Sequence, residues 1–113
     1  MGRIMATVEV KKLERDGQVA VLVSPGYGAG WSTWATEFNE MMLFDADIVH
    51  AVLDGDREKA ARIATEKAGE YVCVLGAEDL VVKWIDKGTA FRINEYDGAE
   101  SLEIISQISG VIA

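Results

Sequence analysis

The spacing of the apolar residues changes twice along this chain, and this change limits the fold more than any other feature does. Near the N-terminus, residues 7–14 are rich in β-branched side chains, and Gln18 to Val23 forms a second apolar run. The dipeptide Asp16-Gly17 lies between the two runs, and both of its residues tolerate the positive φ that a two-residue hairpin loop requires. This segment predicts a β-hairpin.

The middle of the chain has helical spacing. Asp45 is placed to cap a helix over Ala46 to Leu53, and Asp56 is placed to cap a second helix that continues to about Ala68, before Gly69. Residues 31–42 have mixed helical character. The middle of the chain therefore predicts two or three short helices.

The last third returns to strand-like spacing. Lys87-Gly88 and Asp97-Gly98 are turn dipeptides between apolar runs. The expected strands are residues 71–75, 80–85, 89–96 and 101–105. Together with the N-terminal hairpin they predict one α+β domain over residues 1–113, in which short helices cover one face of a mainly antiparallel sheet completed by a C-terminal meander.

Charge and composition exclude some classes of partner. The chain has 19 acidic and 11 basic residues, a formal charge of −8, and this charge disfavours binding to nucleic acid or to an anionic membrane. No apolar run is long enough to span a bilayer, and the single cysteine, Cys73, cannot form an internal disulfide. We therefore expect a cytoplasmic protein.

The segment from Ser24 to Gly30 is the sharpest local motif. Gly26, Gly28 and Gly30 alternate there, after an expected strand and before a possible helix, where backbone amides can cradle phosphate. The motif lacks the full dinucleotide spacing and the lysine of a phosphate-binding loop. A turn or a mobile flap is thus the favoured interpretation, with phosphate binding as the alternative.

Three aromatic residues accompany these glycines. Tyr27, Trp31 and Trp34 could form a wall for a planar ligand or an anchor for a protein partner. Because Trp31 and Trp34 are three residues apart, they would share a helical face, and at least one of them is expected to pack in the core.

A second candidate surface lies on the strand expected at residues 89–96. Arg92, Asn94 and Tyr96 alternate onto one face of that strand, where they could bind a small anion. The alternative is a solvated face on which Arg92 pairs with an acid.

The sequence offers few candidate catalytic residues. A Cys73–His50 nucleophilic pair is formally possible, but an apolar strand raises the pKa of a thiol, and no third residue is available to orient the pair. The carboxylates of the last third, which include Glu100, could form an acid–base pair in principle, but most of them are expected at turns or on the surface. We predict no catalytic residue, no metal site and no cofactor.

Two stretches carry a family resemblance: residues 23–34, with the sequence VSPGYGAGWSTW, and residues 88–101, with the sequence GTAFRINEYDGAES. They resemble small proteins of phages and other mobile genetic elements for which no activity is established. The resemblance therefore implies no functional residue.

These observations favour a non-enzymatic accessory protein of a mobile element that binds a protein or a small ligand through the aromatic glycine-rich loop. A homo-oligomer is expected, because the apolar residues 104–113 would be a liability unless they pack against their own domain or against another chain. The alternatives are a nucleotide-sequestering protein and a small hydrolase or transferase that uses His50, Cys73 or a carboxylate pair. The candidate binding residues are Tyr27, Gly28, Gly30, Trp31, Trp34, Arg92 and Tyr96.

Overall fold

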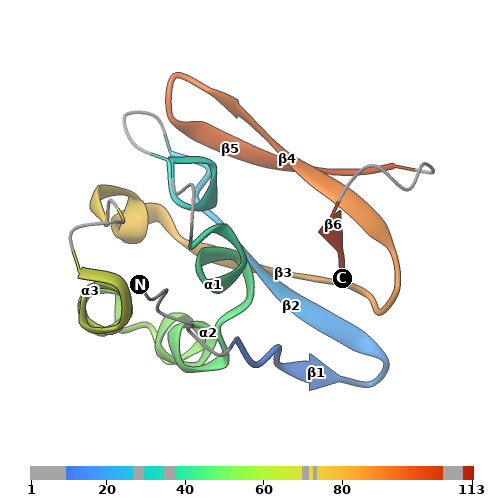
Figure 1. Ribbon diagram of the computed structural model, residues 1–113, viewed down its shortest axis with the longest axis horizontal. Helices are drawn as coiled ribbons and strands as arrows, with labels where there is room; N and C mark the ends of the chain where they lie inside the picture. Colours follow the sequence, from blue (N-terminus) through green and yellow to red (C-terminus); the bar gives the residue numbers. More distant parts are fainter. Residues whose placement is uncertain (1–9, 27–29, 35–37, 70–71, 73, 106–110) are drawn as a thin grey trace, which may run out of the picture.

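The computed structural model describes residues 10–26, 30–34, 38–69, 72, 74–105 and 111–113, and it confirms the α+β class. The strands are β1 (Glu14–Arg15), β2 (Gln18–Val23), β3 (Val81–Asp86), β4 (Ala90–Tyr96), β5 (Ala99–Ile104) and β6 (Val111–Ile112). The helices are α1 (Asn39–Phe44), α2 (Ala46–Leu53) and α3 (Arg57–Ala68), with 3-10 turns η1 (Ser32–Trp34) and η3 (Leu75–Asp79). The helices, the first sheet and the second sheet form successive layers (Figure 1).

The first sheet has the strand order β1-β2-β3 and is antiparallel. Its hairpin turns at Asp16 and Gly17, whose φ values of 53° and 80° confirm the turn that the sequence predicts. The central strand β2 is buried on both faces: Ala20 and Leu22 pack against the helices, and Val19, Val21 and Val23 pack toward the second sheet. One strand therefore contributes to both hydrophobic cores.

The second sheet has the strand order β5-β4-β6. Phe91 of β4 meets Phe44 of α1 edge to face, with ring centroids 6.0 Å apart. The C-terminus pairs with the domain itself, because Ala113 accepts a hydrogen bond from Gly88 N–H and donates one to Thr89 O. At its described end, the apolar tail thus packs against its own chain.

Two features of the predicted sheet differ in the structure. β3 pairs with β2 rather than with the C-terminal strands, so the expected single sheet is divided into two. The strand expected at residues 71–75 is wrong where the structure describes it, because Val74 lies outside any strand and Leu75 begins η3. Val72 and Val74 pack against the helix-side core without a partner strand, so their apolar character reflects this packing.

The helix caps follow the prediction. Asp45 accepts a hydrogen bond from Ile48 N–H, and Asp56 accepts one from Lys59 N–H. The small side chains of Ala60, Ala64 and Ala68 form the buried stripe of α3. Within the described residues, no helix is long and apolar enough to cross a membrane.

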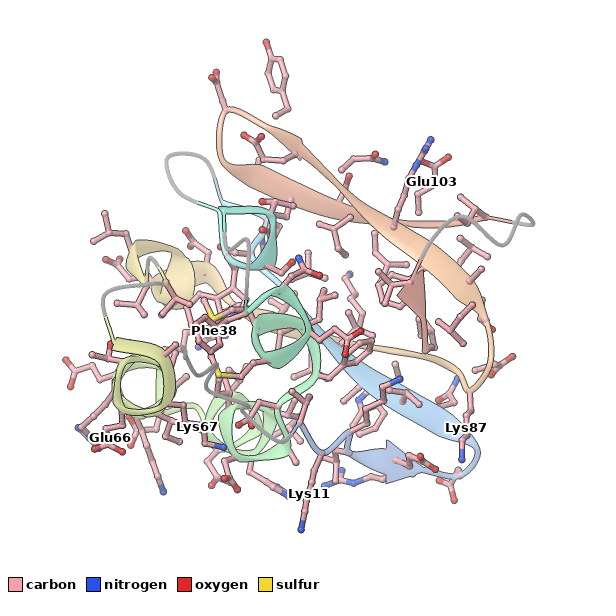
Figure 2. All side chains as sticks on the ribbon, viewed as in Figure 1. Lys11, Phe38, Glu66, Lys67, Lys87 and Glu103 are labelled. Atoms are coloured by element: carbon pink, nitrogen blue, oxygen red, sulfur yellow. The ribbon has the colours of Figure 1, made fainter. Side chains whose placement is uncertain are left out.

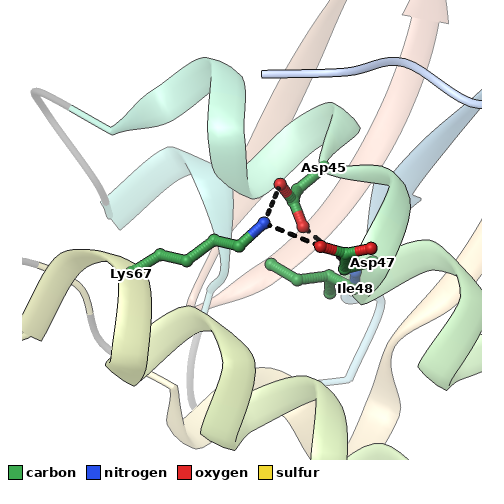
Figure 3. Close-up of polar contacts among 4 residues, drawn as sticks. All are labelled: Asp45, Asp47, Ile48 and Lys67. Atoms are coloured by element: carbon green, nitrogen blue, oxygen red, sulfur yellow. Dashed lines mark hydrogen bonds and ion pairs between the residues drawn. The ribbon is translucent and has the colours of Figure 1, made fainter. Parts of the chain in front are cut away.

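An ion pair joins α3 to the start of α2 (Figure 3). Lys67 Nζ lies 2.7 Å from Asp45 Oδ1 and 3.1 Å from Asp47 Oδ2. Partial burial lowers the pKa of Lys67, but the hydrogen bonds and negative charges of the two aspartates outweigh it and raise the pKa above 10.5. Asp45, which is only 2% exposed, thus serves as both helix cap and counter-ion.

The substitution Asp45→Ala removes the cap and the main partner of Lys67. We expect it to lower the free energy of unfolding by about 2–4 kcal/mol. The matched control is Asp47→Ala, because Asp47 is 69% exposed, and its removal should cost about 0.5 kcal/mol or less. Urea unfolding of both variants measures the difference, and equal losses would contradict the assignment.

The ion pair also predicts a pH dependence. Because the pKa of Lys67 is raised on folding, its contribution is complete below pH 10.5 and is lost as the pH rises through the folded value. The stability difference between the wild type and a Lys67→Met variant should therefore be smaller at about pH 11.5 than at about pH 8, with the loss confined to pH values above 10.5. A difference that stays constant over this range would show that Lys67 contributes through packing alone.

Candidate functional site

The structure places one buried carboxylate where the glycine-rich loop meets the second sheet. Glu100 is 2% exposed, and its Oε1 accepts a hydrogen bond from Ser24 N–H at 3.0 Å. Its Oε2 accepts from Trp31 N–H at 2.6 Å, from Thr33 N–H at 3.1 Å and from Thr33 Oγ1 at 2.6 Å. Glu100 N–H also donates to Ser24 O. One side chain therefore joins both ends of the loop to β5.

This arrangement bears on phosphate binding by the loop. An amide cradle needs free N–H groups, but three of those at the described ends of the loop are bonded to a carboxylate of the same chain. Ser24 Oγ donates to Gly76 O, and Gly26 lies directly against Asp79. The described part of the loop thus binds an internal anion.

The residues predicted on the loop have different positions. Trp31 is fully buried and donates from its ring Nε1 to Met42 O at 2.6 Å, which confirms that at least one tryptophan is a core residue. Gly30 is buried beside it, and Trp34 ends η1. Tyr27 and Gly28 lie outside the described residues, so their predicted role in binding stays a prediction.

On the face of β4 that the sequence predicted as an anion site, an acidic side chain already occupies the donors. Arg92 Nε and Asn94 Nδ2 both donate to Glu103 Oε1, at 2.9 and 2.8 Å, on the outer side of the second sheet (Figure 2). The hydrogen bond from Asn94, followed by the hydrogen bond and charge of Arg92, lowers the pKa of Glu103 below 4.5. Tyr96 is 74% exposed at the end of the strand. Arg92 therefore pairs with an acid, as the alternative interpretation expected.

The candidate catalytic residues are not brought together by the described structure. His50 is exposed on α2, in a hollow whose lining also includes Asp47, Asp54, Lys59, Glu66 and Ile63. Cys73 lies outside the described residues. The part of the chain that the structure describes contains no group of three or more His, Cys, Asp or Glu side chains suited to hold a metal ion.

An apolar groove lies between the two sheets and was not predicted from the sequence. We call it the inter-sheet groove; its volume is about 410 Å³, and it is lined by Val23, Pro25, Lys83, Trp84, Ile85, Glu100, Ser101, Leu102 and Ile104. Its residues come from β2, β3 and β5, so only the folded chain assembles it. Ile104 is 55% exposed, and Pro25 connects the groove to the glycine-rich loop.

Sequence reasoning missed Glu100, although a signal was present. Glu100, Leu102 and Ile104 alternate along β5 and share the face turned toward the first sheet. An acid on an otherwise apolar face must find hydrogen-bond donors, and here the donors come from the glycine-rich loop. Glu100 is therefore an exception to the expectation that most carboxylates of the last third lie at turns or on the surface.

Comparison of the chain with known protein families, with curated proteins and with solved structures found no match. The resemblance to small proteins of mobile elements accordingly stays a prediction.

The Glu100 contacts generate a direct test. A Glu100→Gln substitution places an amide NH₂ against a backbone N–H donor in either orientation of the side chain, so it should lower the free energy of unfolding by about 2–4 kcal/mol. The matched control is Glu103→Gln, because Glu103 is exposed on the same strand and its substitution should change stability little. Urea unfolding compares the two, and similar small losses would show that the buried contacts are unimportant.

Proposed function

We propose that this chain is a non-enzymatic binding protein whose inter-sheet groove receives an apolar group of a ligand. The observation that carries the proposal is the groove itself, a concave and mainly apolar surface with few polar groups, which is the usual form of a small-ligand site. Its volume of about 410 Å³ lies within the range of such sites.

The ionisable groups in the groove support binding rather than reaction. Glu100 and Lys83 are the two ionisable residues that line it. Both oxygens of Glu100 accept hydrogen bonds from the loop, so this carboxylate has a structural task. A carboxylate that acts as a general acid or base must instead lie within hydrogen-bond reach of the ligand atom to which it gives a proton or from which it takes one.

The proposed binding surface lies beside the surface that the sequence predicted. The sequence pointed to the rings of the glycine-rich loop, but Trp31 lies in the core. The groove adjoins that loop through Pro25 and Glu100. A role as an accessory protein of a mobile element is compatible with ligand binding here and forms part of the same proposal.

Octanol tests whether the groove binds an apolar chain without any contribution from charge. In an amide-resolved NMR titration, we expect shift changes that cluster at Lys83, Trp84, Leu102 and Ile104, with a Kd of about 1 mM for so small a ligand. The smaller hollow around His50, which five charged side chains line, should not respond.

A pair of substitutions locates the site. Ile104→Asp should weaken octanol binding at least about fivefold, because it places a charge in the apolar groove. Ile112→Asp is the control: Ile112 is 45% exposed on β6, outside the groove, and its substitution should leave binding unchanged. Shifts scattered over the surface, or equal effects of the two substitutions, would refute the proposed function.

A further inference from the structure

Lys83 occupies an unusual position for a lysine. It alternates along β3 with Val81 and Ile85, whose side chains pack in the core between the two sheets. Lys83 therefore projects from the inward face of the strand, and it is exposed because the inter-sheet groove opens at this point. It forms no ion pair with any residue that the structure describes.

The edge of β5 supplies hydrogen-bond donors beside the same groove. Glu100 N–H donates to Ser24 O, so the backbone of Glu100 faces away from β4. Because backbone groups alternate along an antiparallel strand, the N–H groups of Leu102 and Ile104 also face away from β4. β5 is an edge strand, and no other described strand pairs with these two groups.

Glu100, the other ionisable residue that lines the groove, forms no ion pair with Lys83. The Glu100 carboxylate is already stabilised by the amides of Ser24, Trp31 and Thr33. The groove thus combines apolar walls with one unpaired cation and two unpaired main-chain donors. These are the groups that hold a carboxylate attached to an apolar body.

From this combination we infer that the inter-sheet groove binds a small amphipathic carboxylate, an acyl chain that ends in a carboxylate. The inference rests on the proposed function of the groove and names the class of its ligand. The acyl chain packs against Ile85, Leu102 and Ile104, and the head group accepts hydrogen bonds from Lys83 Nζ and from the free edge of β5.

A competing explanation assigns Lys83 a protective role. β3 is an edge strand, and an inward-pointing charge on an edge strand discourages pairing with another chain. Under that explanation, removal of the charge promotes self-association and leaves ligand preference unchanged. The two explanations therefore predict different properties of the same variant.

Octanoate and octanol, which share a chain length and differ in head group, are the probes. Titrations by calorimetry and NMR use the wild type, Lys83→Met, Lys83→Arg and the control Lys87→Met, whose lysine pairs with Glu14 outside the groove. We expect the wild type to bind octanoate about fivefold more tightly than octanol. Lys83→Met should abolish this preference, and Lys83→Arg and Lys87→Met should keep it.

The amide signals give an independent readout. Octanoate should shift the N–H resonances of Leu102 and Ile104 downfield, and octanol should not, because only the carboxylate accepts a strong hydrogen bond. Octanol binding in the groove without a preference for octanoate would overturn the ligand class and leave the proposed function intact. If Lys83→Met self-associates and still prefers octanoate to octanol, the inferred ligand class would be overturned in favour of the protective role of Lys83. If neither probe binds in the groove, both proposals fail.

Discussion

The fold around the candidate site depends on one buried carboxylate that serves as an internal ligand. From a strand of the second sheet, Glu100 accepts hydrogen bonds from backbone amides on both sides of the glycine-rich loop. A buried charge is tolerated only when donors surround it, and Ser24, Trp31 and Thr33 supply those donors. The same contacts therefore stabilise Glu100, position the loop and join the two sheets.

The inter-sheet groove follows from this junction. The sheets meet where Ser24 bonds to Glu100, and β3 and β5 beyond that point contribute the walls of the groove. On the other side of β2, the helices form a separate core that includes Ala20 and Leu22. Under the proposed function, a ligand in the groove therefore contacts a surface whose shape depends on Glu100 and, through it, on the glycine-rich loop.

The sequence predicts the local elements well, because their signals are local. Asp16-Gly17 and Asp97-Gly98 require positive φ values and adopt them, and Asp45 and Asp56 cap their helices. The strands form two sheets because β3 pairs with β2, and no local sequence signal predicts this pairing. The groove and the burial of Glu100 result from that pairing, so they were missed. Val72 and Val74 misled the strand prediction, because apolar residues that pack against a core have the same spacing as the residues of a short strand.

Native-state hydrogen exchange at the amides of Ser24, Trp31 and Thr33 tests the central claim most directly. If Glu100 holds the loop, these three N–H groups should exchange only through large-scale unfolding, with protection close to that of β2. A Glu100→Gln variant should then lose protection at these amides first, while Val21 in the sheet keeps most of its protection. Rapid exchange of the three amides in the wild type would contradict the account, because it would show that the loop opens without breaking the fold.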